Sequence, residues 1–274
     1  MSNVSIEFFN IARTQVDRAE VQRWMDYLGA DEYEIPSPEV ATDPALLIAL
    51  AAKRCYMAFQ VSLNPNLTMV RKDMCDYIDN ILASSHGSVC EHSVYTFAIE
   101  GVSRVFTGEL NRHRAGWAIS EGSMRFIRFD KDIPWWMPKS LRFNDADDED
   151  LHMRKIRSQG VFQRAFRQMQ ENYTELLGIW DMDEKHHLFG YKKKVTSCLR
   201  RIIGMGVATG GVWTGNIRAL RHVLTMRGDD AAEEEIFHVF AEKIGPYMIE
   251  RESMLFGDFT PSATGALVPK YRKV

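Results

Sequence analysis

Hydrophobic and polar positions recur with different periods along the N-terminal half of the chain. Asp43-Pro44, a cap residue followed by proline at the first helical position, precedes the apolar run ALLIALAAKRCYMAF and predicts a helix over 43–59. Apolar residues at helical spacing predict a second helix from about Thr68 to the turn at 84–88. Residues 93–102, SVYTFAIEGV, alternate and are rich in β-branched and aromatic side chains, which predicts a strand. Ser103 can cap a following helix, which would carry Arg104, Glu109, Arg112 and His113.

The C-terminal half is mostly helical in pattern. Residues 117–129 are too irregular to assign, and long helical patterns follow at about 151–177 and 185–203. Thr214 is the expected cap of a helix that ends at Gly228, and Asp229 or Asp230 can start another. Helices outnumber strands and the two kinds of element occur in separate runs, which favours the α+β class. No repeat or linker divides the chain, so we expect a single domain over 1–274.

Composition and charge narrow the class of protein. The formal net charge of −3 argues against a basic protein that coats a polyanion. The longest apolar run, Ala45–Ala52, has eight residues, far fewer than the roughly 20 that cross a bilayer. The first residues carry charges throughout and lack the apolar core of a secretory signal. We therefore expect a cytoplasmic protein with no membrane partner.

The cysteines and histidines give little sign of a metal or a covalent nucleophile. Four cysteines, Cys55, Cys75, Cys90 and Cys198, are scattered without a C-x-x-C and predict reduced thiols. Cys198 lies near a cation, Arg200, that could lower its pKa, which makes it the candidate nucleophile. The histidines of the turn His86-Gly87-Ser88 to Glu91-His92 lack zinc-ligand spacing, so no metal is expected, and His86 either contacts a ligand or caps the turn.

Two clusters of cations predict sites for anions. Arg112-His113-Arg114 precedes Ser123-Met124-Arg125, and guanidinium groups bind phosphate oxygens in pairs of hydrogen bonds. The second cluster follows Thr214, on a helix where four cationic or histidine side chains have no acidic neighbour: Arg218, Arg221, His222 and Arg227. The alternatives are an exposed basic helix end for the first cluster and, for Arg227, a plain interaction with the helix dipole.

These motifs, taken in order, resemble the flavin-dependent thymidylate synthases. That family's signature is Arg-His-Arg, seven residues, then Ser and a nearby Arg followed by an aromatic, and Arg112-His113-Arg114 with Ser123-Met124-Arg125-Phe126 is similar to it. Upstream, His86-Gly87-Ser88, Glu91-His92 and Gly101-Val102-Ser103-Arg104 match; downstream, Trp213 to Arg218 and Arg227 recur, with Arg200 sixteen residues before Asn216. The resemblance covers a core of about 84–228.

The resemblance implies a fold, a reaction and a set of site residues. The fold would be an antiparallel sheet flanked by long helices, in a homotetramer with FAD where subunits meet. The enzyme would methylate C5 of dUMP with methylenetetrahydrofolate as carbon source and NADPH as reductant, without a covalent cysteine. The flavin would be held by His86, Ser88, Arg112, His113, Arg114, Asn216, Arg218 and His222. The nucleotide would be held by Glu109, Glu121, Ser123, Arg125, Arg200 and, from a neighbouring subunit, Arg227, with Ser123 and Arg227 as catalytic residues.

Three departures from the family pattern point to an altered substrate. Eight residues rather than seven separate Arg114 from Ser123, Glu109 stands where Gln is usual, and Ala231 stands where His is common. UMP methylation is therefore the second hypothesis, and hydroxymethylation of the same carbon is a third. A non-enzymatic nucleotide- or RNA-binding protein is the alternative of another class. It would need exposed aromatics among cations, for which Trp135-Trp136 is a weak match, so no nucleic acid is expected.

Overall fold

The computed structural model describes residues 3–129, 131–184 and 186–274, which form two compact units. Unit 1 contains Met1–Phe8, Ala98–Arg112 and Ile119–Val212, and unit 2 contains Phe9–Phe97, His113–Ala118 and Trp213–Val274. Lys185, where a helix was expected to start, lies outside the described residues. The expectation of a single domain stays a prediction.

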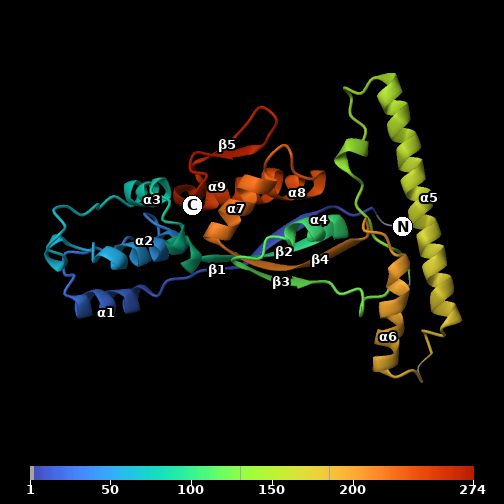
Figure 1. Cartoon of the computed structure of the whole chain (residues 1–274), viewed down its shortest axis with the longest axis horizontal. Coiled ribbons are helices and arrows are strands. Elements are labelled where there is room, and N and C mark those ends of the chain that lie inside the picture. The colour runs from blue at the N-terminus through green and yellow to red at the C-terminus, as the bar shows by residue number, and fades with distance from the viewer. Residues whose placement is uncertain (1–2, 130, 185) are drawn as a thin grey trace. The chain divides into compact units, whose positions relative to one another are not determined.

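The strands of the described residues form a four-stranded sheet and a separate two-stranded one. The larger sheet has the order β1-β2-β4-β3, with bounds β1 Glu7–Arg13, β2 Val94–Ser103, β3 Trp117–Glu121 and β4 Ala208–Asn216 (Figure 1). In the smaller sheet β5, Phe259–Pro261, pairs antiparallel with β6, Leu267–Pro269.

Neighbouring strands of the larger sheet run antiparallel. The Arg104 backbone N–H donates to the Val207 carbonyl at one end of the β2–β4 pair, and the hydroxyls of Thr96 and Thr214 meet 2.9 Å apart further along. Residue numbers fall from Arg104 to Thr96 on the β2 side, whereas they rise from Val207 to Thr214 on the β4 side. The two strands are therefore antiparallel. Gly101 of β2 has φ +76°, and a Cβ there would lie 2.0 Å from the Ser5 carbonyl oxygen, so only glycine fits.

Helices make up most of the remaining structure. Their bounds are α1 Arg18–Leu28, α2 Asp43–Tyr56, α3 Met74–Ala83, α4 Arg104–Leu110, α5 Glu149–Ile179, α6 Phe189–Leu199, α7 Ile217–Arg227, α8 Glu234–Val239, α9 Gly245–Arg251 and α10 Ser253–Phe256. Of the helices that the described residues form, none combines the length and the hydropathy needed to cross a bilayer. The predicted α+β class, with an antiparallel sheet and flanking helices, is confirmed.

Several predicted helix limits are wrong, because a cap is set by backbone geometry rather than by residue type alone. Thr42, not Asp43, caps α2, and α3 begins at Met74 rather than near Thr68 because Asp73 accepts the Asp76 N–H. Thr214 lies in β4, and Asn216 caps α7. The cap at Ser103 is confirmed: its Oγ accepts hydrogen bonds from the backbone N–H groups of residues 105 and 106.

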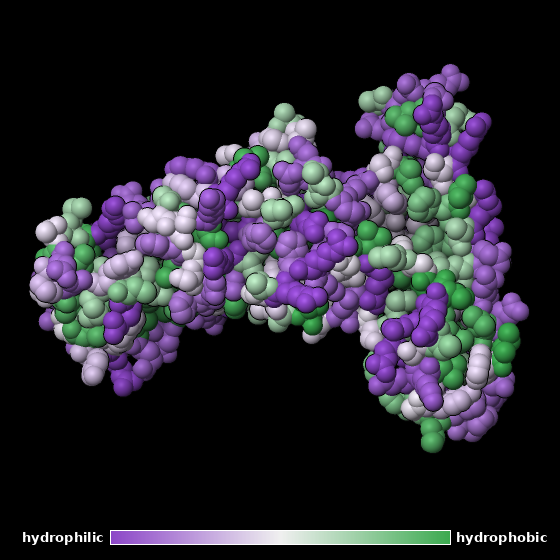
Figure 2. All heavy atoms as spheres, viewed as in Figure 1, coloured by the Kyte–Doolittle hydropathy of each residue, from purple (hydrophilic) through white to green (hydrophobic). Residues whose placement is uncertain are grey.

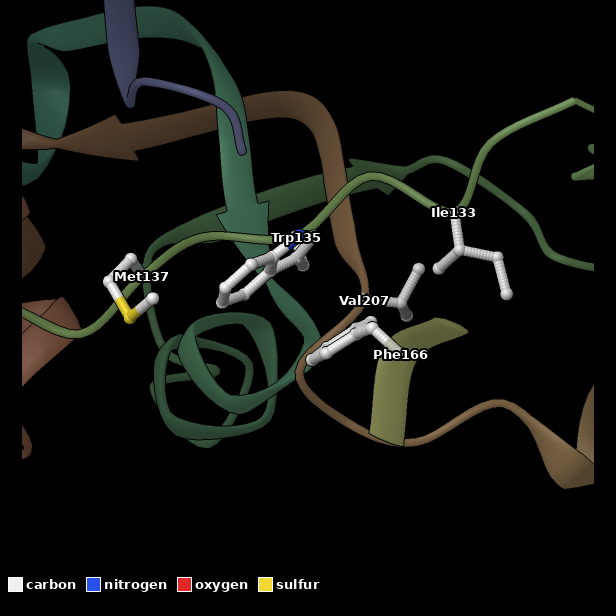
Figure 3. Close-up of a cluster of buried hydrophobic side chains, with 5 residues drawn as sticks. All are labelled: Ile133, Trp135, Met137, Phe166 and Val207. Atoms are coloured by element: carbon white, nitrogen blue, oxygen red, sulfur yellow. The ribbon is translucent and has the colours of Figure 1, made fainter. Parts of the chain in front are cut away.

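An apolar cluster holds unit 1 together. Its side chains come from α5, from the loop that leads into β4 and from the segment before α5 (Figure 3). They are Ile133, Trp135, Met137, Phe166 and Val207. The rings of Trp135 and Phe166 stack with centroids 5.0 Å apart. Trp135 is 4 % exposed, so it packs in the core and offers no platform for bases.

A helical hairpin extends unit 1. In Figure 1 α6 lies beside α5, and Tyr173 and Leu177 of α5 pack with Val195 and Leu199 of α6. Hydrophobic surface, green in Figure 2, shows over this hairpin. The exposed apolar residues of the hairpin include Ile179, Leu188 and Phe189, each more than 60 % exposed. Such a patch is larger than isolated surface hydrophobics and is typical of a surface that another protein covers.

A buried carboxyl group anchors the core of unit 2. Glu252 is 1 % exposed, and its two oxygens accept hydrogen bonds from the hydroxyls of Tyr95 and Thr42. Burial raises the pKa of Glu252 above its ordinary value, and burial together with the nearby Glu252 raises the pKa of Tyr95. Stability from a carboxyl group with a raised pKa is present at low pH and is lost as the pH rises through the folded-state value.

Replacing Tyr95 by phenylalanine should destabilise the chain by about 1.5–3 kcal/mol at neutral pH, because Glu252 loses a donor to its charge. The pKa of Glu252 should rise further, so the deficit should shrink as the pH falls and the carboxyl group protonates in both proteins. Urea unfolding at neutral and mildly acidic pH measures both effects. Tyr27→Phe, which removes the hydroxyl of a tyrosine on α1 that is 87 % exposed, is the control. An equal deficit at both pH values would contradict this account.

Candidate functional site

The predicted site residues fall into two groups, one in each unit. Unit 2 contains His86, Ser88, His113, Arg114, Asn216, Arg218, His222 and Arg227. Unit 1 contains Glu109, Arg112, Glu121, Ser123, Arg125 and Arg200. With the exceptions of Arg112 and Arg227, the residues expected to hold a flavin share unit 2, and those expected to hold a nucleotide share unit 1.

In unit 2 the turn after α3 lies against α7. Residues Gly87–His92 form a short 3₁₀ segment, η2, that packs on α2 and α7. A Cβ at Gly87 would lie 2.4 Å from the backbone of Val274 and 2.8 Å from Nε of Arg218, so only glycine allows this approach. His86 and Ser88, on either side of Gly87, are exposed. The turn thus presents two polar side chains beside an arginine.

Two of the α7 arginines have acidic partners, which corrects the expectation that the helix carries an unpaired excess of cations. Arg218 Nη1 lies 2.6 Å from a carboxylate oxygen of Glu91, and this ion pair is half exposed. Arg221 is buried and binds both oxygens of Asp258, at 2.6 and 2.9 Å. The partners come from positions far along the chain, so inspection of the helix alone did not reveal them. Arg221 therefore serves the fold, whereas Arg218 remains at the surface.

Asn216 connects the start of α7 to the loop that carries Arg114. Its side-chain oxygen accepts the Ala219 N–H at 2.8 Å, and its backbone N–H donates to the Gly116 carbonyl at 3.0 Å. Gly116 has φ +76°, and a Cβ there would lie 2.6 Å from the Asn216 amide nitrogen. Asn216 therefore caps α7 and anchors the loop that carries Arg114. Arg114 itself is exposed.

The far end of α7 brings three predicted residues together. Arg227 Nε donates to Nε2 of His113 at 3.0 Å, and the rings of His113 and His222 meet edge to face with centroids 5.6 Å apart. This contact between the Arg-His-Arg motif and Arg227, 114 residues later, was not predicted, since the family resemblance implied that Arg227 reaches a neighbouring subunit. Arg227 and His222 of α7 therefore lie beside His113 of the Arg-His-Arg motif.

In unit 1 the helix α4 ends at Leu110, so Arg112 and His113 lie beyond it and not on it as predicted. Arg112 still reaches Glu109, with 3.2 Å between Nη1 and a carboxylate oxygen. The Arg112 side chain is 71 % exposed, whereas that of Glu109 is only 20 % exposed. The pair therefore places an anion and a cation side by side at the end of α4.

Glu121 is engaged within the chain. One carboxylate oxygen pairs with Arg104, and the other accepts the Asn111 amide at 3.2 Å. Arg104 also donates to the Gly122 carbonyl. Glu121, Arg104 and Gly122 border a cavity of about 610 Å³ that Met124 and Phe129 line with apolar surface. Arg104 is a site residue that we did not select from the sequence, although it closes the matched segment 101–104.

The Ser123 turn positions Arg125. Ser123 Oγ accepts the Arg125 N–H at 3.3 Å, and its carbonyl accepts the N–H groups of Phe126 and Ile127. A serine hydroxyl that accepts a backbone bond keeps its own proton for another acceptor. Arg125 itself is exposed. The turn thus offers a hydroxyl donor and a guanidinium group on the same segment.

Arg201 shares a pocket with Arg125, and its neighbour Arg200 stays a predicted ligand of the nucleotide. Both begin the short 3₁₀ segment η4, Arg200–Ile202, after α6. Arg201 lines a pocket of about 420 Å³ with Arg125, and Arg200 is not among its lining residues. Neighbouring positions on a helical turn point about 100° apart, so a shift of one residue in the motif changes which side chain reaches the pocket.

The thiols and metal ligands give no second kind of site. Burial raises the pKa of Cys90 to about 11, which makes it a poor nucleophile at neutral pH. Cys198 is exposed and lines the pocket that contains Arg125 and Arg201. Within 3–129, 131–184 and 186–274, no cluster of His, Cys, Asp or Glu has the arrangement of a metal site. Fold and site together define an α+β protein whose turns present arginines for anionic ligands.

Comparison with known proteins identifies the family. The thymidylate synthase complementing protein family, Thy1, matches residues 39–246. Flavin-dependent thymidylate synthase from Halobacterium salinarum is 30 % identical over 225 residues, covering 72 % of this chain and 83 % of its own. The enzyme of the same name from Corynebacterium diphtheriae is 28 % identical over 241 residues, covering 84 % and 88 %. This chain therefore belongs to the Thy1 family and is an enzyme of the flavin-dependent thymidylate synthase type.

Solved structures share its fold. The UMP/dUMP methylase PolB from Streptomyces cacaoi, bound with 5-Br dUMP, has a TM-score of 0.60 and 18 % identity, covering 92 % of this chain and 93 % of its own. Thymidylate synthase X from Helicobacter pylori, with FAD and dUMP, has a TM-score of 0.54 and 19 % identity, covering 93 % and 98 %. Family membership overturns the alternative of a non-enzymatic nucleotide- or RNA-binding protein.

Proposed function

We propose that this enzyme methylates C5 of uracil in a nucleoside monophosphate, with dUMP as the expected substrate. FAD would be the cofactor, methylenetetrahydrofolate the carbon donor and NADPH the reductant. The observation that carries the proposal is the pair of motifs Arg112-His113-Arg114 and Ser123-Met124-Arg125 in a chain of this family. Each motif presents exposed guanidinium groups, as the phosphates of a nucleotide require.

The side chains of unit 2 fit a flavin in their chemistry. Arg114 is an exposed cation suited to its diphosphate, and His86 with Ser88 adds neutral donors at the turn. A cation near the pyrimidine edge of the ring would favour its anionic, reduced form, a role for Arg218. When bound, FAD would supply the hydride chemistry of the reaction. Asn216 would contribute by holding the Arg114 loop in place.

The side chains of unit 1 fit the nucleotide. Arg125 would bind the phosphate, and Ser123 would both orient Arg125 and donate its own hydroxyl proton. Ser123 and Arg227 are our candidates for residues that touch the reacting nucleotide. Glu121, held by Arg104 and Asn111, would act through this network by fixing the loop beside the nucleotide rather than through a free carboxylate. Holding the two rings in transfer geometry can lower a barrier by about 7–11 kcal/mol at best.

UMP is the second candidate substrate. The likeness to PolB, whose solved forms carry 5-Br dUMP and 5-Br UMP, favours it. A ribose 2′-hydroxyl needs an acceptor, and Glu109 provides a carboxylate where the family usually has an amide. The Glu109 side chain is 20 % exposed and pairs with Arg112, and a carboxylate oxygen that accepts one hydrogen bond can accept a second.

We propose a homotetramer as the functional form, with Arg227 reaching the nucleotide of a neighbouring subunit. The exposed apolar residues of the α5–α6 hairpin support association, since a subunit would cover them.

Turnover with dUMP and UMP side by side tests the function. The FAD-loaded protein receives methylenetetrahydrofolate and NADPH, and mass spectrometry identifies the product as a gain of one methyl group, one hydroxymethyl group or nothing. We expect one methyl group on dUMP, with UMP as the competing substrate. A protein that takes up FAD, as judged by visible flavin absorbance, but leaves both nucleotides unchanged would overturn the proposal.

Single replacement of each cysteine by alanine should leave methylation within about threefold of the unmodified rate, because the proposed chemistry forms no bond to a thiol. Cys198 is the informative position, since it is exposed, whereas Cys90 is buried with its pKa raised to about 11. Initial rates with the chosen nucleotide provide the measurement, and Cys55→Ala, also at an exposed thiol, is the matched control. Loss of turnover in Cys198→Ala alone would indicate covalent catalysis instead.

A further inference from the structure

The pocket that contains Arg125 and Arg201 has more positive charge than a nucleoside monophosphate needs. Two further cations, Lys193 and Lys194, line it from α6, and its remaining lining residues, Gly190, Ser197 and Cys198, are uncharged. A phosphate monoester carries about 1.5–2 negative charges near neutral pH, which two guanidinium groups already match. The two ammonium groups would then remain uncompensated in a space of about 420 Å³.

The spacing of α6 explains why these side chains face one pocket. Lys193 lies four residues before Ser197, and Lys194 lies four residues before Cys198. The members of each pair therefore share a face of the helix. Arg201 follows Lys194 by seven residues, two helical turns later. The guanidinium of Arg201 donates through Nη1 to the Ser197 carbonyl at 3.0 Å, which ties it to the end of the helix.

The cations have few competing partners inside the chain. Within 3–129, 131–184 and 186–274, Arg125, Lys193, Lys194 and Arg201 form no ion pair with a carboxylate. Lys193 Nζ lies 4.5 Å from the ring centroid of Phe126, which stacks on Phe189, so an aromatic pair rather than an anion orients it. Four cations that line one pocket repel one another unless an anion compensates them.

We propose that this basic pocket binds two linked phosphate groups, with Lys193 and Lys194 recognising the second group beside the one bound by Arg125 and Arg201. The linked phosphates could come from a nucleoside diphosphate or from free pyrophosphate, which share this chemistry. The proposal rests on the proposed function only in assigning Arg125 to a nucleotide phosphate. It predicts that the enzyme distinguishes uridine nucleotides by the number of their phosphates.

Titration calorimetry with inorganic phosphate and with pyrophosphate tests the pocket without any methylation assay. The unmodified protein should bind pyrophosphate at least about tenfold more tightly than phosphate. The double replacement Lys193→Gln with Lys194→Gln should reduce that ratio to within about twofold. Lys131→Gln with Lys192→Gln removes the same charge from unit 1 outside the pocket, and it should keep the ratio. Thermal unfolding confirms that both double variants are folded.

Two results would overturn the proposal: equal affinity for phosphate and pyrophosphate, or a pyrophosphate preference that survives loss of Lys193 and Lys194. A preference lost equally in the control variant would also overturn it, since general charge would then explain binding. UDP and UMP, titrated with pyrophosphate as competitor, identify the source of the two phosphates. UDP that binds more tightly than UMP and is displaced by pyrophosphate supports a nucleotide, and pyrophosphate binding with no difference between UDP and UMP supports a free anion. Failure of methylation would leave these affinities unchanged.

Discussion

Replacing Arg221 by methionine should lower the free energy of unfolding by about 3–5 kcal/mol, the largest effect we expect from a single substitution. Arg221 is buried on α7 and binds both carboxylate oxygens of Asp258, and it also donates to the carbonyls of Leu255 and Tyr271. Methionine fills much of the same space but leaves the Asp258 charge buried without its partner. Chemical denaturation at neutral pH measures the loss.

Two further variants separate burial of charge from loss of contact. Arg218→Met removes an arginine from the same helix, but its pair with Glu91 is half exposed and should be worth only about 0–1 kcal/mol. Adding Asp258→Leu to Arg221→Met should recover part of the lost stability, because the unpaired carboxylate is then removed. Equal losses for Arg221→Met and Arg218→Met would contradict the assignment of Arg221 to the fold.

Replacing Arg125 by glutamine should weaken binding of the nucleoside monophosphate about 10- to 150-fold, the range for loss of a charge-assisted hydrogen bond of about 1.5–3 kcal/mol. The exposed guanidinium follows the Ser123 turn and has no carboxylate partner within the described residues, so the loss should fall on the ligand rather than on the fold. Isothermal titration with dUMP measures it. Affinity for FAD should stay within about twofold, because the residues proposed for the flavin lie mainly in unit 2.

Arg128→Gln is the matched control for Arg125→Gln. Arg128 follows on the same segment but donates to the Met182 carbonyl and pairs with Asp183. Arg128→Gln removes one positive charge at nearly the same place in the chain as Arg125→Gln, and it should change dUMP affinity little. If both variants weaken dUMP equally, long-range charge rather than a direct phosphate contact explains the effect, and Arg125 does not belong to the site.

Local patterns predicted the elements whose signals are short in range. Alternation over 93–102 predicted β2, and the apolar spacing of 151–177 predicted the long helix α5 within two residues at each end. The strand β4, ATGGVWTGN, was missed because its glycines interrupt the alternation of side chains that marks a strand. At Gly210 a Cβ would lie 1.8 Å from a carboxylate oxygen of Glu100, so a side chain there would displace the end of the Glu100 side chain.

The site was predictable where a motif carried it and not where a distant partner decided it. The motifs led to His113 and Arg227, which the structure joins. They could not show that Asp258 pairs with Arg221, because no local rule relates positions 37 residues apart. Arg200 stays a prediction, since the pocket that Arg125 lines contains its neighbour Arg201.

Because Val274 contacts the turn at Gly87, a label at position 274 would report on binding at that turn. The Arg218 Nε lies 3.4 Å from the Val274 carbonyl, and Tyr271 is tied to α3 by hydrogen bonds from its hydroxyl to Asp79. A small fluorophore attached at position 274 would therefore lie beside His86 and Ser88. Only the few residues after Tyr271 would separate it from the fixed part of the chain. A yellow chromophore that binds at this turn would quench it by energy transfer, which gives an optical readout of cofactor loading.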